Sequence, residues 1–567
     1  MFNHIIFVTY LVVFLISTIG HGYLFASIFY KNFKSLNFGY LGIIGFFSIT
    51  LISTFSIFFT PHDYLHNTIL HLVGLSAFFM NFFSDKKNNF DQLKKILLIL
   101  IIMGSGIYVF KNHDDFPYYH LTYALNLSQN SMLIGTGSFS HGFRTMSSLF
   151  YYHSTLYLPF IKFYLFHSGP FLILIFFNYI ILIKLFEKFK KDEFDIVYFF
   201  SLLNFIFVNV VFYRIAEHGT DRSGQILLFI IFITFFEILF LEKLNKNKVI
   251  LFNFLLVATF LAASMKVLFI IYLILVPIIL FKKKFYKYYF NKNNVGLVAI
   301  IFFAFSLNIS TNFFSTGCLI YPAEKTCFFK KVDWSISKKE VKLMKNHYEW
   351  WAKAGGGPGY KSEMKREIYI KNFNWVNNWI NRHFFNKVSD TLLGIIFISL
   401  LTFILFKENK KYKMKSRNII LINSILFLFF IEWFLKHPSM RYGGFVLFAL
   451  PFFIFTSKKI EEFKHNKSKI FNSTVLLVLL TLTVYNGRNI SRLNTEINNY
   501  SPGYDIIKSP FFNIPKTEVE VIYEKDNFKI YKPIAGMCWA APTPCSYYPS
   551  LVVDNWFGFK VIKRDIK

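Results

Sequence analysis

The clearest chemical group in the sequence is a pair of adjacent carboxylates, Asp114 and Asp115, which follow a long apolar segment. Adjacent carboxylates can take a proton from an attacking hydroxyl, and with help from His113 they can hold a divalent cation such as Mg²⁺ or Mn²⁺. Tyr119 and His120 follow closely and could support a substrate there. A structural alternative stays open, because an Asp that precedes the run HLTYALNL can cap the N-terminus of a helix.

A second charged group occupies the short segment RIAEHGTDR, residues 214–222, between two apolar runs. Its members that could bind a substrate or support the first group are Glu217, His218, Asp221 and Arg222. So dense a cluster of charges can also be no more than a solvated turn. Its interest is that the predicted topology places it on the same side of the membrane as the carboxylate pair.

Two cations stand where apolar segments break or begin. Lys266 interrupts the stretch ATFLAASMKVLFIIYL, and an ionisable group at such depth is a functional candidate unless it reaches the interface by snorkelling. Arg441, within HPSMRY, stands at the start of another apolar helix. Together the two side chains could bind an anionic phosphate at the membrane surface, which is the leaving group that a lipid-linked donor requires.

The composition places all of these residues in an integral membrane protein. Of the 567 residues, 54% are hydrophobic, 21% are aromatic and 77 are Phe, far more than a soluble core would use. A formal charge of +30 could suggest a nucleic-acid partner. However, Lys falls mainly in short clusters between apolar runs, which is the pattern of loops retained in the cytoplasm, so no nucleic acid is expected.

About fourteen apolar stretches are long enough to cross a bilayer. They lie near residues 5–29, 39–60, 69–84, 96–110, 170–186, 194–213, 225–241, 249–264, 267–281, 295–314, 391–406, 418–435, 442–456 and 470–486. The first lacks a preceding basic segment, so we expect a crossing and not a cleavable signal peptide. Residues 149–167 are also apolar, but a crossing there would reverse the basic bias of the later loops. This segment should therefore be interfacial or re-entrant.

The basic linkers determine the predicted topology, because loops rich in Lys and Arg stay in the cytoplasm. These linkers are 86–95, 187–193, 242–248, 282–294, 407–417 and 458–469. The sequence thus predicts an all-α polytopic membrane protein of roughly 14 transmembrane helices, with a small α+β extracytoplasmic domain at its C-terminus. Its expected regions are N-terminal transmembrane helices at 1–110, a first large periplasmic loop with interfacial helices at 111–169, central transmembrane helices at 170–314, a long periplasmic loop at 315–390, C-terminal transmembrane helices at 391–486 and the periplasmic C-terminal domain at 487–567.

Cysteine and tryptophan give independent evidence on sidedness. The four cysteines form two close pairs, Cys318 with Cys327 and Cys538 with Cys545, and both pairs fall in segments predicted to lie outside. Two local disulfides in an oxidising periplasm follow from that placement. The eight Trp residues fall on the same side or at its interface, either as an aromatic belt or as a surface for a sugar ring or a lipid.

In their order along the chain, these segments resemble the GT-C class of membrane glycosyltransferases, which take sugars from polyprenyl-phosphate carriers. HDDFPYYH is similar to the acidic site in the first large outer loop of bacterial members. GCLIYP is similar to their S-G-x-x-x-Y-P stretch, and the segment from Pro438 to Tyr442 to their P-x-x-R-Y helix start. The other matching features are the later acidic loop at 217–221, the intramembrane Lys266 and a terminal motif at 538–545.

The resemblance implies an inverting transfer of a sugar from a polyprenyl-phosphate donor to a glycan, lipid or cell-envelope acceptor. The active site would face the periplasm from the bacterial inner membrane. Asp114 or Asp115 would be the general base, beside a divalent metal if one takes part. Lys266 and Arg441 would neutralise the departing lipid phosphate. The sequence contains no glycine loop for a nucleotide phosphate, which is consistent with a lipid donor.

Two other classes of membrane protein stay open. A transporter or a lipid or oligosaccharide flippase would show inverted repeats and polar groups at mid-bilayer, and neither is evident in the sequence. A lipopolysaccharide-type polymerase or ligase also carries out membrane glycosyl transfer, but those enzymes usually lack a sizeable C-terminal domain. The charged residues instead gather at one predicted face of the membrane, which favours chemistry at that face.

Overall fold

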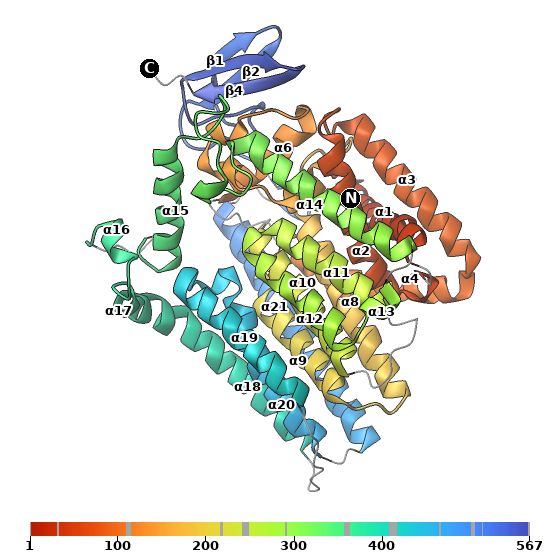
Figure 1. Ribbon diagram of the computed structural model, residues 1–567. Coiled ribbons are helices and arrows are strands. Elements are labelled where there is room, and N and C mark those ends of the chain that lie inside the picture. Colours follow the sequence, from red (N-terminus) through yellow and green to blue (C-terminus); the bar gives the residue numbers. More distant parts are fainter. Residues whose placement is uncertain are drawn as a thin grey trace.

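The structure is a computed structural model, which describes residues 2–30, 33–108, 115–215, 219–240, 249–289, 292–356, 363–407, 417–463, 466–500, 505–512 and 514–564. It is mostly helical, with a small region of β-strands near the C-terminal end. Most of the long helices run in similar directions, and the strands lie beyond one end of them (Figure 1).

The long helices coincide with the apolar stretches of the sequence. They are α1 (Phe2–Phe29), α2 (Phe38–Ser56), α3 (Tyr64–Ser84), α4 (Lys86–Ile102), α8 (Ser168–Lys190), α9 (Ile196–Val211), α10 (Thr220–Phe240), α11 (Val249–Met265), α14 (Lys292–Thr316), α18 (Ser389–Phe406), α19 (Arg417–Lys436), α20 (Gly444–Glu461) and α21 (Lys467–Tyr500). A 3₁₀ segment, η6 (Val267–Ile274), and α12 (Leu275–Lys282) share one further stretch.

The expected number of crossings is only partly supported. Among the described residues, nine helical segments are long and apolar enough to cross a membrane, and three shorter apolar ones are α9, α11 and Val267–Lys282. Helices α4 and α20 belong to neither group, because each includes several Lys residues of the adjoining basic linker within its helix. The count of fourteen is therefore not confirmed, whereas a multi-pass membrane protein is compatible with these apolar helices.

The first three helices pack very closely through glycine. A Cβ atom built on Gly45 of α2 would lie 1.7 Å from the carbonyl oxygen of Thr18 in α1. A Cβ on Gly20 of α1 would lie 1.8 Å from the carbonyl oxygen of Gly74 in α3. Small residues let apolar helices approach one another in this way within a membrane, where lipid tails compete equally for large side chains.

The apolar stretch 149–167 does not form a helix of spanning length. Helix α7 (Ser148–Thr155) has eight residues, and turns connect it to the start of α8 at Ser168. Its side chains are buried against other parts of the first loop and against α2. The apolar side chains of α7 are therefore buried inside the protein at one end of the helices.

The C-terminal region contains two antiparallel hairpins. One pairs β1 (Val519–Lys525) with β2 (Phe528–Pro533), and the other pairs β3 (Leu551–Trp556) with β4 (Phe559–Arg564). Of the expected α+β domain at 487–567, the β part is present: residues 505–512 and 514–564 contain strands and turns and no helix. Residues 487–500, which we placed in the same domain, continue helix α21 to Tyr500, beyond the expected crossing at 470–486.

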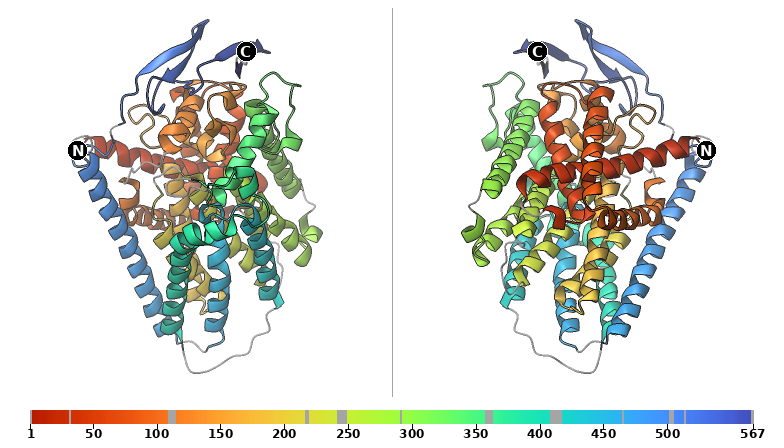
Figure 2. Two further views of the ribbon diagram at one scale, coloured as in Figure 1. Left: turned by 90° about the vertical axis from the view of Figure 1, so that its left-hand side faces the viewer. Right: turned by 90° about the vertical axis from the view of Figure 1, so that its right-hand side faces the viewer.

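Different segments lie at the two ends of the helices, with basic linkers at one end and the first loop and the β-strands at the other. At one end Lys467 lies 2.7 Å from Asp192, and Lys469 donates to the carbonyl of Lys407, so three basic linkers meet. At the other end the first loop contacts the β-strands, with Ile134 donating to the carbonyl of Lys560 at 3.0 Å. Figure 2 shows the strands at the end opposite the lower tips of α18 and α20. These three basic linkers and the β-strands therefore lie at opposite ends of the helices.

Candidate active site

Asp221, in the first turn of α10, lies between two cations. Its Oδ1 is 2.7 Å from Nζ of Lys266, and its Oδ2 is 3.7 Å from Nε of Arg441. The side chains of Lys266 and Asp221 are 28% and 20% exposed, so water reaches the pair only partly. Three residues that the sequence separates widely therefore form one ionic cluster.

Lys266 is placed by a break between two helices. Helix α11 ends at Met265, Lys266 has an extended backbone, and η6 begins at the next residue. Ser147 donates to the carbonyl of Met265 at 2.8 Å, which satisfies one acceptor that the end of α11 leaves open. Two features distinguish Lys266 within this apolar stretch. Its charge is visible in the sequence, and the change of backbone direction is visible in the structure.

Arg441 lies in the short connection between α19 and α20. Trp433 donates its indole N–H to the carbonyl of Ser439 at 3.0 Å, and Trp379 does the same to Pro438 at 2.6 Å. Gly443 then adopts a positive φ of 98°, which starts α20 at the next residue. Buried indoles thus fix the connection, and at these positions they do not form an exposed aromatic belt.

The ring of Tyr442 lies beside both cations. Arg441 donates from Nη2 to the Tyr442 hydroxyl at 2.8 Å, and its Cζ is 4.8 Å from the ring centroid. Lys266 Nζ is 5.3 Å from the same centroid. Partial burial alone would lower the pKa of Arg441, but Tyr442 and Asp221 outweigh it and the pKa of Arg441 is raised. Arg441 is therefore held as a charged group beside the ring.

Asp115 brings the first loop to this cluster. It precedes a π-helical turn, η2 (Phe116–His120), and its side chain makes no capping hydrogen bond to that turn. Burial first, then the charges of Asp115 and Asp221, raise the pKa of Tyr119 well above its usual value of 10.0. The charge of Asp115 also acts on Arg441. The charges of both carboxylates and of Arg441 therefore all act on Tyr119.

The other residues expected at the site either lie outside the described residues or contact residues near them in the sequence. His113, Asp114, Glu217 and His218 lie outside the described residues. His120 is buried, with its ring 4.4 Å from that of Tyr119. Arg222 donates to the carbonyl of Arg214 and so closes its own loop. Within the described ranges no three His, Cys, Asp or Glu side chains form a group that could hold a metal ion, so no chemical step is assigned to one.

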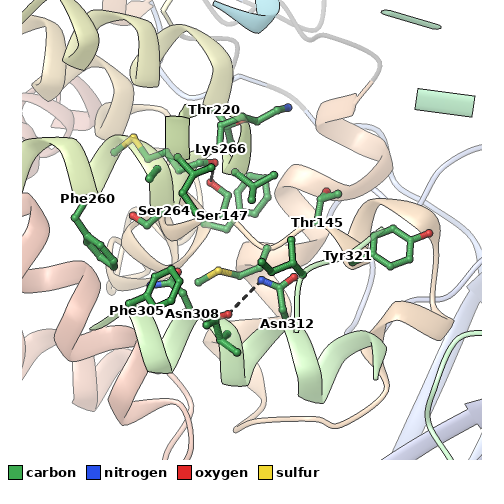
Figure 3. Close-up of a pocket in the computed structure, with 18 of the residues that line it drawn as sticks. Thr145, Ser147, Thr220, Phe260, Ser264, Lys266, Phe305, Asn308, Asn312 and Tyr321 are labelled. Carbon is green, nitrogen blue, oxygen red and sulfur yellow. Dashed lines mark hydrogen bonds between the residues drawn. The ribbon is translucent and has the colours of Figure 1, made fainter. Parts of the chain in front are cut away.

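A pocket with mostly apolar walls begins at Lys266 and Tyr119 (Figure 3). Its other walls come from α11, η6, α14, the loop after α14 and the segment before α7, and include Phe260, Ile270, Leu273, Phe305, Ile309 and Leu319. Ile270 is also 39% exposed. The ammonium group of Lys266 points away from Phe305, so the pocket has a cationic edge and an apolar interior.

A family model described as a domain of unknown function, DUF8201, matches residues 4–449. The chain belongs to this family. The matched region contains Asp115, Asp221, Lys266 and Arg441, whereas the C-terminal hairpins lie beyond it. No curated protein and no solved structure gives a significant match to the chain.

Sequence reasoning missed a second buried ionic group in this DUF8201 member. Arg144 is only 1% exposed and donates to Glu340 at 2.7 Å, and Arg564 of β4 donates to the same carboxylate at 2.9 Å. Arg144 also donates to the Tyr321 hydroxyl at 3.4 Å. Three distant segments supply these residues, and no spacing along the chain indicates that they meet. The group joins the first loop, α15 (Lys338–Ala352) and the β region beside the pocket.

Both expected cysteine pairs are bonded, Cys318 to Cys327 and Cys538 to Cys545. The first disulfide closes a loop directly after α14, next to the pocket residues Leu319 and Tyr321. The second closes a loop between the two hairpins. Each bridge joins residues that are close in sequence, so it chiefly limits the shape of its own loop.

Proposed function

We propose that the protein is a GT-C type glycosyltransferase of the bacterial inner membrane, with its site facing the periplasm. It would move a sugar from a polyprenyl-phosphate donor to a glycan or lipid acceptor. The observation that carries this proposal is a cation in the wall of an apolar pocket, Lys266, which Asp221 links to a second cation, Arg441. Lys266 and Arg441 stand together with Asp221, beside the turn that Asp115 precedes.

The donor phosphate fits the charge of this cluster. Asp221 balances one of the two positive charges of Lys266 and Arg441, which leaves one for the single negative charge of a phosphodiester. Among the described residues, no acceptor lies within hydrogen-bond distance of Arg441 Nε, which is buried. A buried donor of this kind is costly unless a ligand accepts from it. A phosphate oxygen would supply that acceptor.

The lipid part of the donor fits the pocket walls. The pocket extends from Lys266 along η6 and α14, and Val267 and Ile270 on its rim are 46% and 39% exposed. Such exposed apolar residues on a membrane helix face lipid, so an isoprenoid chain could enter from the bilayer with its phosphate at the cationic edge. The sugar would then project toward Asp115 and Tyr119.

The chemistry is a single displacement at the anomeric carbon. The acceptor hydroxyl oxygen bonds to that carbon while the bond from the carbon to the phosphate oxygen breaks, which inverts the configuration. Asp115 takes the hydroxyl proton as the general base. The polyprenyl phosphate leaves with one more negative charge than it carried in the donor, and Lys266 and Arg441 stabilise that charge as it develops.

A transporter or flippase is the alternative class. The observation that favours it is the presence of polar side-chain pairs between the apolar helices. Lys184 pairs with Glu237, and Asn178 with Asn209, within stretches that the sequence marks as apolar. Both pairs join neighbouring helices among α8, α9 and α10, so these four side chains bond to one another. Their pairing supports a structural role.

The proposal is tested by incubating the purified protein with a panel of polyprenyl-phosphate sugars and acceptors. The release of polyprenyl phosphate and the transfer of sugar are measured together. A glycosyltransferase releases the lipid phosphate only as sugar appears on the acceptor. Movement of intact donor between the leaflets of a proteoliposome, with no release of polyprenyl phosphate, would support the flippase instead.

A further inference from the structure

The C-terminal region reaches back to the turn that follows Asp115. Trp539 donates its backbone N–H to the carbonyl of Pro117 at 3.1 Å. The hydroxyl of Tyr547 donates to the carbonyl of Tyr118 at 3.3 Å. Two successive carbonyls of the turn η2 are therefore held by residues more than 400 positions later in the chain.

The two donors belong to one small closed structure, which we call the brace, residues 538–547. Cys538 and Cys545 bond to each other and are almost fully buried. The backbone N–H of Cys538 donates to the Tyr547 hydroxyl at 2.8 Å, so this hydroxyl accepts from the loop and donates to the turn. The disulfide and Tyr547 thus both hold the backbone at Cys538 in place.

The brace is itself fixed to the rest of the molecule. Tyr531 of β2 donates to the carbonyl of Pro544 at 2.9 Å, and Ser546 donates back to the carbonyl of Tyr531 at 2.8 Å. Tyr547 donates its backbone N–H to the carbonyl of Phe139, in the first loop. The brace is therefore attached both to the strands and to the first loop, and cannot shift without breaking hydrogen bonds.

Aromatic contacts strengthen the connection to the turn. The ring of Trp539 packs edge-on against Phe116 at 6.2 Å, and the rings of Tyr118 and Tyr547 are 4.8 Å apart. Tyr118 also forms a 2.9 Å hydrogen bond with His141. Since Phe116 is the residue after Asp115, the brace contacts the backbone and side chains that set where the carboxylate points.

We propose that the brace positions Asp115, with Tyr547 as its main positioning residue. The brace lies beyond the part of the chain that the family model matches, whereas Asp115 lies within it. The catalytic consequence rests on the proposed function, because Asp115 acts there as the general base. The structural consequence is that the turn η2 loses its order without the brace, and this consequence does not depend on the proposed function.

The other disulfide provides a matched control. Cys318 and Cys327 also close a short outer loop, and the backbone hydrogen bonds inside it join Leu319 to Thr326 and Phe328 to Gly317. Removal of this bridge should loosen its own loop and leave η2 unchanged. The comparison therefore separates loss of the brace from general loss of a disulfide.

The first readout is amide hydrogen exchange of the full-length purified protein over peptides that cover residues 116–123. Tyr547→Phe, which keeps the ring and removes both hydroxyl bonds, should raise exchange there about fivefold. Cys538→Ser with Cys545→Ser should raise it further, and Cys318→Ser with Cys327→Ser should not. Exchange unchanged in both Tyr547→Phe and the Cys538/Cys545 variant would overturn the proposal.

The second readout is the kinetics of sugar transfer. Positioning of the base predicts that Tyr547→Phe lowers kcat about tenfold while the KM for the donor stays within about twofold. A kcat equal to that of the wild type would overturn a role in positioning Asp115. Raised exchange together with a wild-type protein that transfers no sugar would reject the glycosyltransferase and still support the brace.

Discussion

The ammonium group of Lys266 lies 2.7 Å from Oδ1 of Asp221, although Lys266 stands at the break between α11 and η6 and Asp221 in the first turn of α10. A lone Lys at this depth could have reached the interface by snorkelling. The ion pair, with the Tyr442 ring beside it, gives the ammonium group a specific location instead. The pair then joins Arg441, so one carboxylate organises both cations of the proposed donor site.

The two partners of this ion pair should therefore depend on each other for their contribution to stability. Lys266→Ala and Asp221→Ala are each expected to cost about 1–3 kcal/mol, because the remaining charge stays partly buried and loses its partner. The double variant should cost less than the sum of the two. Thermal unfolding in detergent measures the three values. The exposed pair Lys95 and Asp91 is the control, and its cycle should give a coupling near zero.

Arg441 should contribute directly to binding of the lipid phosphate. Arg441→Ala is expected to weaken binding of polyprenyl phosphate about 10- to 100-fold, because a charge-assisted hydrogen bond and a positive charge are lost together. Arg441→Lys should recover part of the affinity through its charge alone. Binding is measured by native mass spectrometry in detergent. Lys508→Ala, at a position that is 86% exposed, is the control, and an equal loss there would reject a specific site.

The Arg144, Glu340 and Arg564 group predicts a pH dependence of stability. Burial alone would raise the pKa of Glu340, but the two arginines outweigh it and its pKa falls below the usual 4.5. A lowered pKa means that the carboxylate stabilises the fold above about pH 4.5, and that this contribution is lost as the pH falls through the folded value. The melting temperature of the wild type should therefore approach that of Glu340→Gln between about pH 4.5 and 3.

The control for this pH series is Glu524→Gln, which removes a carboxylate from an exposed pair with Lys529. Exposed pairs contribute little, so the wild type and this variant should unfold at nearly the same temperature at every pH. A constant difference between the wild type and Glu340→Gln down to pH 3 would contradict the assignment of the pH effect to this carboxylate.

The glycine contacts of the N-terminal helices predict a large effect from one methyl group. Gly45→Ala should lower the melting temperature by several degrees, because its Cβ would meet the backbone oxygen of Thr18 and α1 would have to move. Gly394→Ala in α18 is the matched control, since no atom lies within 4 Å of its Cβ position. Equal melting temperatures for the two variants would show that the close packing of α1 and α2 contributes little.

The sequence predicted the helices and the partners of the disulfides well, because both depend on local signals. Apolar length locates a membrane helix, and two close cysteines have few other partners. Lys266 and Arg441 were also recognisable as charges in apolar surroundings. Their contact with Asp221 was not, because it depends on how α10, α11 and the connection before α20 pack.

Other features depend on contacts between segments that the sequence cannot align. Arg144, Glu340 and Arg564 come from the first loop, α15 and β4, and each alone looks like an ordinary surface charge. Helix α21 extends to Tyr500, beyond the expected crossing at 470–486, because local signals are weak at element boundaries. The sequence indicated the brace at 538–547 by its cysteine pair and by the terminal motif at 538–545, but it did not indicate the contact of the brace with η2.

The most direct test of the account is the turnover of Asp115→Asn, measured beside Asp114→Asn on a donor that the wild type uses. Asp115→Asn should bind the polyprenyl-phosphate donor with unchanged affinity and transfer its sugar at least about 100-fold more slowly, because only the acceptor of the proton is lost. Transfer at the wild-type rate by both variants would contradict a carboxylate base at this position, and with it the proposed site.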